Sequence, residues 1–353
     1  MKYRKLGSSG LSVSDLILGT MGFGTETEEK EAFAILDAFV EAGGTMIDTS
    51  DVYGKGTSEE LIGRWRASRS DEVTDQVAIA TKARFGTGPG INDVGLSRRH
   101  LDRSLNTSLR RMGVETIDLF QMHGWDALTP VEETLSFLDA AMRAGKIHYV
   151  GISNFTGWQL QLFVSTAKAM GVPLPVTLQQ QYSLIYREIE YEVVPAALHN
   201  DLGILPWSPL AAGVLTGKYV RGEASAPKGR LASDDPMTQH QAKQLHNDDH
   251  SWGTLDAVRA IADRIGATPS QVALAWVRDQ PSVTAPIIGA RTMEQLRDNL
   301  GSADVVLDED AITALGNASA PTPDDYPYGR FGVLQRKRYI DSSEQALREL
   351  LRW

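Results

Sequence analysis

The sequence predicts an α/β fold in which eight parallel strands, each followed by a helix, close into a barrel. Eight short apolar runs rich in β-branched residues alternate with amphipathic stretches, and this alternation predicts a parallel sheet. Eight such units are the number found in a (β/α)8, or TIM, barrel. An open doubly wound sheet is the alternative, but the G-x-G-x-x-G sequence that usually marks its dinucleotide site is absent.

The apolar runs are too short for helices, and we interpret each one as a strand. In order they are Asp15–Leu18, Thr45–Asp48, Val77–Thr81, Ile117–Met122, Tyr149–Ile152, Val176–Gln180, Ile204–Trp207 and Ala285–Ile288. We expect a single domain over residues 1–353, with a barrel core at about 15–300.

Helix signals occupy the intervals between the expected strands. Ser97 and Gly113 are typical of the start and end of one helix, whose apolar residues fall on one face. Helices are also expected near 130–144, 190–201 and 291–300. Four capping signals are Thr25 with Glu28, Thr129-Pro130 with Glu132, Thr156 with Gln159, and Thr268-Pro269 with Gln271.

Three segments exceed a minimal barrel. Residues 2–14 are expected to form a small hairpin, residues 218–252 a long polar connection after the seventh strand, and residues 301–353 follow the last helix. The tail, 319–353, contains Tyr326, Tyr328 and Phe331, which could close over the barrel mouth. Its amphipathic end could instead dock on the barrel or on a second copy, which would make a homo-oligomer.

Composition excludes several classes of function. The 353 residues include 35 basic and 45 acidic side chains, a net charge of −10, which argues against a general nucleic-acid or anionic-membrane binder. The absence of cysteine excludes disulfides, thiolate metal sites and cysteine nucleophiles. No signal peptide and no apolar stretch of about 18 residues is evident, so we expect a cytoplasmic protein without a membrane partner.

Four polar residues lie where the expected strands end, which is where barrel enzymes carry their active sites. Asp48 ends the second strand and Tyr53 follows it, while Lys82 and His123 end the third and fourth. A tyrosine, whose pKa is ordinarily about 10, needs a nearby cation to become a useful acid near neutrality. Lys82 could supply that charge, Asp48 could hold the ammonium, and His123 could orient a substrate oxygen.

Taken singly, each of the four has a common structural interpretation. Asp48 could be a turn residue, Lys82 a solvated or ion-paired lysine, Tyr53 a rim aromatic and His123 a hydrogen-bonded structural histidine. Their joint placement favours a proton-donating unit. One histidine and one aspartate are too few ligands for a metal cage, so no metal is expected there.

The stretches that carry these residues resemble the aldo-keto reductase family, in its extended-loop branch. The similarity runs from about Tyr3 to about Asn317. It rests on GGTMIDTSDVYGKGTSEELIG, VAIATK, IDLFQMH, GKIHYVGISNF and PIIGARTMEQLRDNL, in that order. The resemblance implies a barrel that binds NADPH (NADP+) without a Rossmann domain and transfers hydride to an aldehyde or ketone, with Tyr53 as general acid.

The resemblance also implies a set of cofactor residues. Ser153, Asn154 and Gln179 correspond to the carboxamide ligands, and Trp207 to an aromatic that stacks on nicotinamide, where many relatives have tyrosine. Thr20, Met21 and Asp48 are added at the ends of the first two strands. The expected pyrophosphate and phosphate ligands are Ser208, Pro209, Leu210, Gly213, Lys218 and Arg230. Structural interpretations remain: loop capping for the amides, a buried mouth aromatic for Trp207, and solvated surface charges for Lys218 and Arg230.

The start of the last barrel helix completes this set with Gly289, Arg291, Gln295 and Asn299. Arg291 would bind the adenosine 2′-phosphate, which favours NADPH over NADH, and Asn299 would contact adenine. Many relatives have arginine where this chain has Gln295, whose alternative role is to cap the helix opposite Thr292.

Phe23, Phe85 and Trp125 are expected, with Trp207, to form an aromatic rim for a small carbonyl substrate. The alternative function is that of a nucleotide-binding regulatory subunit, as in the potassium-channel β-subunit branch that the chain also resembles. A metal-dependent barrel hydrolase is a weaker alternative, because the ligand set is missing. His240, His246 and His250 in the long connection are expected to be exposed and without a metal.

Overall fold

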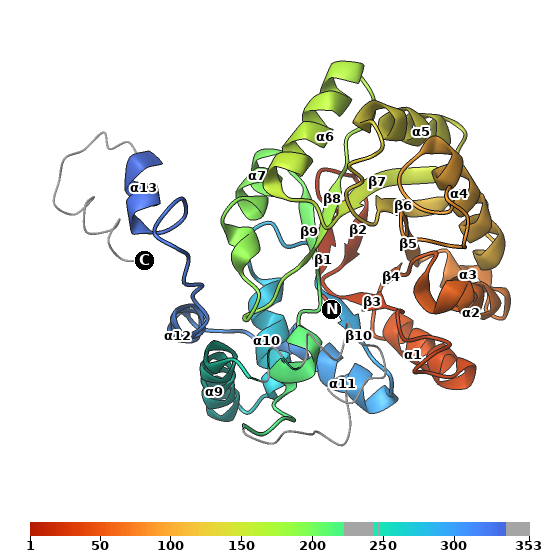
Figure 1. Ribbon diagram of the computed structural model, residues 1–353. Helices are drawn as coiled ribbons and strands as arrows, with labels where there is room; N and C mark the ends of the chain where they lie inside the picture. The colour runs from red at the N-terminus through yellow and green to blue at the C-terminus, as the bar shows by residue number, and fades with distance from the viewer. Residues whose placement is uncertain (222–242, 244, 246, 337–353) are drawn as a thin grey trace.

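Eight parallel strands form a nearly closed barrel in the computed structural model, which describes residues 1–221, 243, 245 and 247–336 (Figure 1). The sheet order is β10-β3-β4-β5-β6-β7-β8-β9, and a bridge between Ile204 and Val283 brings β9 to the chain entering β10. The strands are β3 (Ile17–Gly19), β4 (Met46–Asp48), β5 (Ala78–Ala83), β6 (Ile117–Met122), β7 (Ile147–Ser153), β8 (Thr177–Gln181), β9 (Gly203–Trp207) and β10 (Ile287–Gly289). The predicted fold class is confirmed, and each strand end lies within two residues of its prediction.

Helices surround the barrel on its outer side (Figure 1). They are α1 (Glu29–Glu41), α2 (Thr57–Ala67), α3 (Asp71–Thr74), α4 (Arg98–Met112), α5 (Val131–Arg143), α6 (Gly157–Met170), α7 (Val193–His199), α9 (Asp249–Ile265), α10 (Pro269–Arg278), α11 (Met293–Gly301) and α12 (Glu309–Ala318), whereas α13 (Arg330–Arg336) stands apart from this ring in Figure 1. No described helix is long and apolar enough to cross a membrane.

Strand alternation divides the barrel into an outer and an inner face. Ile47, Ile79 and Phe120 belong to the large core shared with the helices. Met46, Ala80 and Leu119 belong to a separate, smaller apolar cluster inside the barrel. The inner residues that follow toward the carboxyl ends are polar, so the interior changes from apolar to polar along its axis.

A hairpin closes the amino-terminal end of the barrel. β1 (Tyr3–Lys5) and β2 (Ser12–Ser14) pair antiparallel, which confirms the hairpin expected at 2–14. Its turn carries Gly7 at φ +55°, where a Cβ would lie 1.8 Å from the carbonyl oxygen of Val176. The hairpin thus packs closely against the strand entrances at this end of the barrel.

The capping predictions are confirmed for three helices. Ser97 accepts from His100 N and Gly113 ends α4 in the left-handed region, while the Gln159 side chain accepts from the amide of Thr156. Thr268 and Gln271 form the predicted reciprocal box at α10.

Two capping predictions are wrong, because tertiary contacts draw the threonine hydroxyls elsewhere. Thr25 donates to Gly22 O within a turn, and Thr129 donates to Asp126. α1 then begins after Glu28 and α5 after Pro130, neither with a side-chain cap.

The described part of the carboxyl-terminal third contains more helix than the sequence indicates. α9 begins at Asp249, inside the expected connection, because Asp248 caps it by accepting from Ser251 N. α12, beyond the last barrel helix, packs against α9. The first part of the tail is anchored beside the barrel, where Tyr328 stacks on Tyr191 and bonds to Glu192.

Candidate active site

Three of the four predicted catalytic residues meet at the ammonium of Lys82. Its Nζ atom donates to Asp48 Oδ1 at 2.5 Å, to the carbonyl of Thr49 at 2.7 Å and to Tyr53 Oη at 3.3 Å. These contacts use all three of its hydrogens. The hydroxyl of Tyr53 is thereby fixed as an acceptor toward Lys82, which leaves its own proton to be donated elsewhere.

Asp48 is held by donors from three strands. Oδ1 accepts from Lys82 of β5, while Oδ2 accepts from Gln121 of β6 at 3.1 Å and from Gln179 of β8 at 2.8 Å. The carboxylate is only 3% exposed. Burial alone would lower the pKa of Lys82, but the charges and hydrogen bonds of Asp48 and Tyr53 outweigh it, and the pKa is raised. Lys82 therefore remains an ammonium at neutral pH.

The backbone explains how Tyr53 reaches this ammonium. β4 ends at Asp48, and the chain turns at once into a short 3-10 segment, Tyr53–Gly56. Gly54 and Lys55 have φ values of 56° and 58°, so the chain reverses sharply before α2 begins. The turn brings the Tyr53 ring to 4.8 Å from Lys82 Nζ, with the ring half-buried.

His123 lies beside this pair. Its ring meets that of Tyr53 edge to face at 5.9 Å and that of Phe85 at 4.6 Å. Its Nδ1 atom lies 3.1 Å from Ser50 Oγ. Burial, followed by the charges of Lys82 and Arg84, lowers its pKa well below the ordinary value. A neutral imidazole carries one donor and one acceptor nitrogen. If Ser50 donates to Nδ1, then Nε2 carries the hydrogen, and if Ser50 accepts from Nδ1, then Nε2 is the acceptor.

A second buried polar cluster lies behind Ser50. Ser50 Oγ also lies within hydrogen-bond distance of Asp51 Oδ1, at 3.3 Å, and Asp51 is 2% exposed. Glu59 is fully buried and accepts from Thr81 and Arg111. Burial and the charge of Glu59 raise the pKa of Asp51 to about 7. Sequence reasoning missed Ser50 and Asp51, although both stand inside the quoted second-strand motif.

The predicted carboxamide ligands lie together at the ends of neighbouring strands. Asn154 donates to His123 O and accepts from Trp207 Nε1, so its amide links β6, β7 and β9. Ser153 Oγ accepts from Asn154. Gln179 uses its nitrogen on Asp48 and Gln121, and no described residue donates to its Oε1.

The predicted pyrophosphate loop follows β9 in strained backbone. Ser208 and Gly213 have φ values of 53° and 89°, and Ser208 Oγ accepts from Ala212 N. A Cβ at Gly213 would lie 2.7 Å from Lys218 Nζ, so the two residues are neighbours. Pro209 is buried and Leu210 half-buried. Arg230, and with it His240 and His246, lies outside the described residues.

The loop after β10 also brings charged groups together. Arg291 is half-buried and pairs with Glu26 at 3.5 Å. Gln295 accepts from the amide of Arg291, and its own amide donates to Thr292, which is the capping role. Asn299 is 4% exposed and donates to Gly289 O, so its nitrogen secures the end of β10.

The residues after β3 differ from one another in exposure. Thr20 is buried and bonds to Asp48 O and Ser58, whereas Met21 is exposed. Phe23 is 1% exposed and packs into the large core, so the structure does not offer it to a substrate. An aromatic ring in a loop can face either way, and here a bridge from Phe23 to Thr27 turns it inward.

Phe85 and Trp125 do lie at the mouth, on the loops after β5 and β6. Phe85 is 38% exposed beside His123. Trp125 is half-buried and packs edge to face on Phe155 and Trp158. Arg84, which was not predicted from the sequence, places its guanidinium over the Phe85 ring, with Cζ 5.0 Å from the ring centroid.

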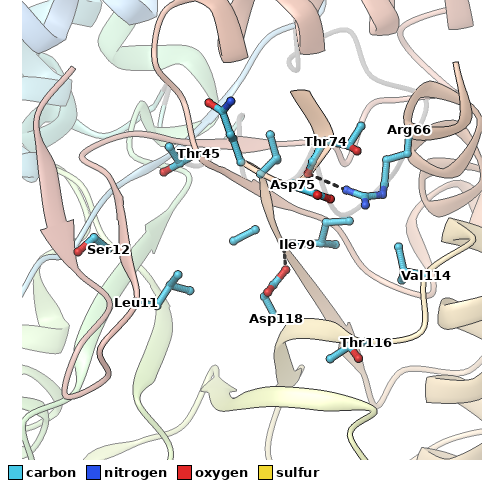
Figure 2. A pocket seen from close by; sticks show the side chains of 13 residues that line it. Leu11, Ser12, Thr45, Arg66, Thr74, Asp75, Ile79, Val114, Thr116 and Asp118 are labelled. Atoms are coloured by element: carbon cyan, nitrogen blue, oxygen red, sulfur yellow. Dashed lines mark hydrogen bonds between the residues drawn. The ribbon is translucent and has the colours of Figure 1, made fainter. Parts of the chain in front are cut away.

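A cavity of about 330 Å³ lies at the opposite end of the barrel, near the starts of β5 and β6 (Figure 2). Its polar groups are engaged with the fold, since Arg66 donates to Thr74 O and Asp118 accepts from Ile79 N. The tetrad residues do not line it. His250 lies at the start of α9, on a separate cavity beside the tail, and the described residues contain no cluster suited to a metal.

Comparison with known proteins agrees with this geometry. A sequence model described as the Aldo/keto reductase family matches residues 15–320. The chain is 37% identical to an uncharacterized oxidoreductase, YrpG, of Bacillus subtilis (strain 168), over 93% of this chain and 100% of that one. It is 34% identical to a probable voltage-gated potassium channel subunit beta of Arabidopsis thaliana, over 87% and 92%. It is 31% identical to an aryl-alcohol dehydrogenase [NADP(+)] of Phanerodontia chrysosporium, over 92% and 86%.

Proposed function

Because the chain belongs to the aldo/keto reductase family, we propose that it reduces aldehyde or ketone groups to alcohols, reversibly, with NADPH as cofactor and Tyr53 as general acid. Family membership supports an oxidoreductase. The observation that carries the finer proposal is the 3.3 Å contact between Tyr53 Oη and an ammonium held in place by Asp48. A cation at this distance stabilises a phenolate and so eases release of the phenol proton.

The residues at the mouth fit a nicotinamide dinucleotide. Gln179 Oε1, which lacks a described donor, and Ser153 would hold the carboxamide, and Trp207 would lie against the ring. Gly213 and Lys218 would hold the pyrophosphate, because glycine leaves room for a close approach beside a cation. When bound, the reduced cofactor supplies the hydride.

Arg291 would take the 2′-phosphate that distinguishes NADPH from NADH. Its present partner, Glu26, forms a part-exposed pair at 3.5 Å, which contributes little to stability. A guanidinium can bind a phosphate through two parallel hydrogen bonds, which are stronger than this pair. Arg230, expected to bind phosphate, and Asn299, expected to contact adenine, stay predictions.

His123 would position the carbonyl oxygen between itself and Tyr53. Its lowered pKa keeps it neutral at physiological pH, and with Ser50 donating to Nδ1 the Nε2–H group would donate a hydrogen bond to the carbonyl and not act as an acid. Tyr53 would deliver the proton to the oxygen, and in alcohol oxidation the phenolate would take it back. Phe85 and Trp125 would line the substrate side with aromatic surface.

The alternative is a nucleotide-binding regulatory subunit with little turnover, and two relatives named as potassium channel subunits suggest it. The complete and tightly bonded tetrad favours turnover. Nucleotide binding followed by protein fluorescence, without oxidation of NADPH by any carbonyl compound, would favour the regulatory role.

Oxidation of NADPH in the presence of 4-nitrobenzaldehyde, followed at 340 nm, tests the proposal. Tyr53→Phe removes the proton donor but keeps the ring, and we expect kcat to fall by roughly 10²- to 10⁴-fold, the usual contribution of a general acid. Tyr191→Phe is the matched control, because this ring stacks on Tyr328 away from the tetrad. Equal rates in the two variants would remove Tyr53 from the proposed mechanism.

A further inference from the structure

Arg84 occupies the next inward position of the chain after Lys82. Side chains alternate along a strand, and in β5 Ile79 and Ala83 face the helices, while Ala80 and Lys82 face the barrel interior. Arg84 follows β5 and continues this alternation. It therefore lies one layer nearer the mouth than Lys82.

His123 is the neighbour of Arg84 in that layer. Lys82 pairs in register with Gln121 of β6, and the amide of His123 donates to Ala83 O, so the pairing continues past the end of both strands. Arg84 is also one of the charges that lower the pKa of His123. The guanidinium thus belongs to the same mouth as the tetrad.

No described residue forms a hydrogen bond or ion pair with the Arg84 guanidinium, and its Nε atom is buried without a partner. Its neighbours include the Phe85 ring and the backbone at Gly124, where a Cβ would lie 3.9 Å from Arg84 Nε. A buried Nε–H group without an acceptor lacks the hydrogen bond that it would make in water, which is costly.

Asp126 is an acidic group close to Arg84. Its pKa is lowered, against the effect of burial, by the hydrogen bonds that it accepts and also by the charge of Arg84. Its oxygens are already used: Oδ2 accepts from Leu96 N and Thr129, and Oδ1 accepts from Leu128 N. In the layer below, Lys82 is neutralised by Asp48. Arg84 is consequently a cation at the mouth whose donors are not matched by a carboxylate of the described residues.

We propose that Arg84 forms an anion subsite, and that the preferred substrates are aromatic aldehydes or ketones that carry a carboxylate. The inference rests on the proposed reductase function and names its substrate class. A carboxylate can accept two parallel hydrogen bonds from a guanidinium, and the aromatic ring that bears it can pack against Phe85. The carbonyl would then face His123 and Tyr53.

Paired substrates that differ in the charge of one substituent test this subsite. 4-Carboxybenzaldehyde and 3-carboxybenzaldehyde are compared with their neutral methyl esters, in assays of NADPH oxidation. We expect the protein to favour the acids by about 10- to 100-fold in kcat/KM, the worth of a charge-assisted hydrogen bond, with most of the effect in KM. Because the attraction is electrostatic, 0.5 M NaCl should reduce this preference.

Arg84→Gln should remove the preference for the acids over the neutral esters, and Arg84→Lys should retain part of it. Arg143→Gln, which removes an exposed arginine of α5, is the matched control. Equal reduction of acids and esters by the unaltered protein would overturn the subsite but leave the reductase function standing.

Failure to reduce any aldehyde, esters included, would instead count against the proposed function. The subsite is then tested by binding alone, with 4-(hydroxymethyl)benzoate and its methyl ester titrated by calorimetry into the protein and into Arg84→Gln. Tighter binding of the acid that is lost in Arg84→Gln supports the subsite. Equal binding of acid and ester, or a preference that survives the substitution, refutes it. Circular dichroism spectra confirm that the variants are folded.

Discussion

Replacing Asp51 by asparagine should make the barrel more stable at alkaline pH than the unaltered protein. Burial, then the charge of Glu59, raises the pKa of Asp51 to about 7, although the nearby hydroxyls of Ser104 and Ser50 and the charge of Arg111 oppose the rise. Asp51 Oδ2 has no hydrogen-bond partner among the described residues. Ionising this carboxyl therefore costs more in the folded than in the unfolded protein.

The size of the effect follows from the two pKa values. A raised carboxyl pKa contributes stability that is fully present below the unfolded value of 3.8 and is lost as the pH rises through about 7. One pKa unit is about 1.4 kcal/mol, so the whole loss is about 4 kcal/mol. Between pH 5 and pH 8 about two of these units remain to be lost, which is about 2.5 kcal/mol.

Urea unfolding followed by tryptophan fluorescence, at pH 5 and at pH 8, measures this loss. Other titrating groups affect both proteins alike, so the quantity of interest is the difference in free energy of unfolding between Asp51→Asn and the unaltered protein. We expect that difference to grow by about 2.5 kcal/mol from pH 5 to pH 8 in favour of the variant. A constant difference would refute the assignment of a neutral Asp51.

Asp37→Asn is the control with the opposite sign. The hydrogen bond from Arg69 lowers the pKa of Asp37, outweighing the effect of burial. A lowered carboxyl pKa contributes stability that is present above 3.8 and lost only at lower pH. The destabilisation by this substitution should thus be the same at pH 5 and pH 8.

Two further predictions concern the cofactor and the fold. Arg291→Ala should raise the KM for NADPH roughly 10-fold while leaving that for NADH nearly unchanged, whereas Glu26→Gln, which removes the competing carboxylate, should lower the KM for NADPH; equal effects on both cofactors would contradict 2′-phosphate recognition. Thr268→Ala removes the side-chain cap of α10 and should cost about 1 kcal/mol, lowering the thermal midpoint by about 1–2 °C, and an unchanged midpoint in calorimetry would show that the cap contributes nothing.

The barrel was predictable because the sequence signals that specify its strands and helices each lie within a few consecutive residues. Apolar runs, helix caps such as Ser97 and a terminal Gly113 each act over a few residues, and the repeating unit then determines the architecture. The convergence of Asp48, Lys82 and His123 followed from the same rule, because parallel strands bring their carboxyl ends to one edge.

The remaining features depend on contacts between distant segments. The environment of Asp51 is built by Glu59 of α2 and by Arg111 and Ser104 of α4, which no periodicity reveals. Thr129 looked like a cap but binds Asp126, and Phe23 looked like a rim residue but packs into the core. Arg84 could have been found, since counting two residues on from Lys82 gives the next inward position.

Lys82 in β5 and Arg84 just after it differ in how much stability a substitution would cost. At Lys82, removal of the ammonium would break three hydrogen bonds and leave Asp48 buried without its cation, a loss of several kcal/mol in typical buried pairs. At Arg84, substitution breaks no described side-chain hydrogen bond. Under the proposed function, the charge at the mouth could therefore change without loss of the hydrogen bonds at Lys82, and substrate choice and proton transfer would be separable along one short segment of the chain.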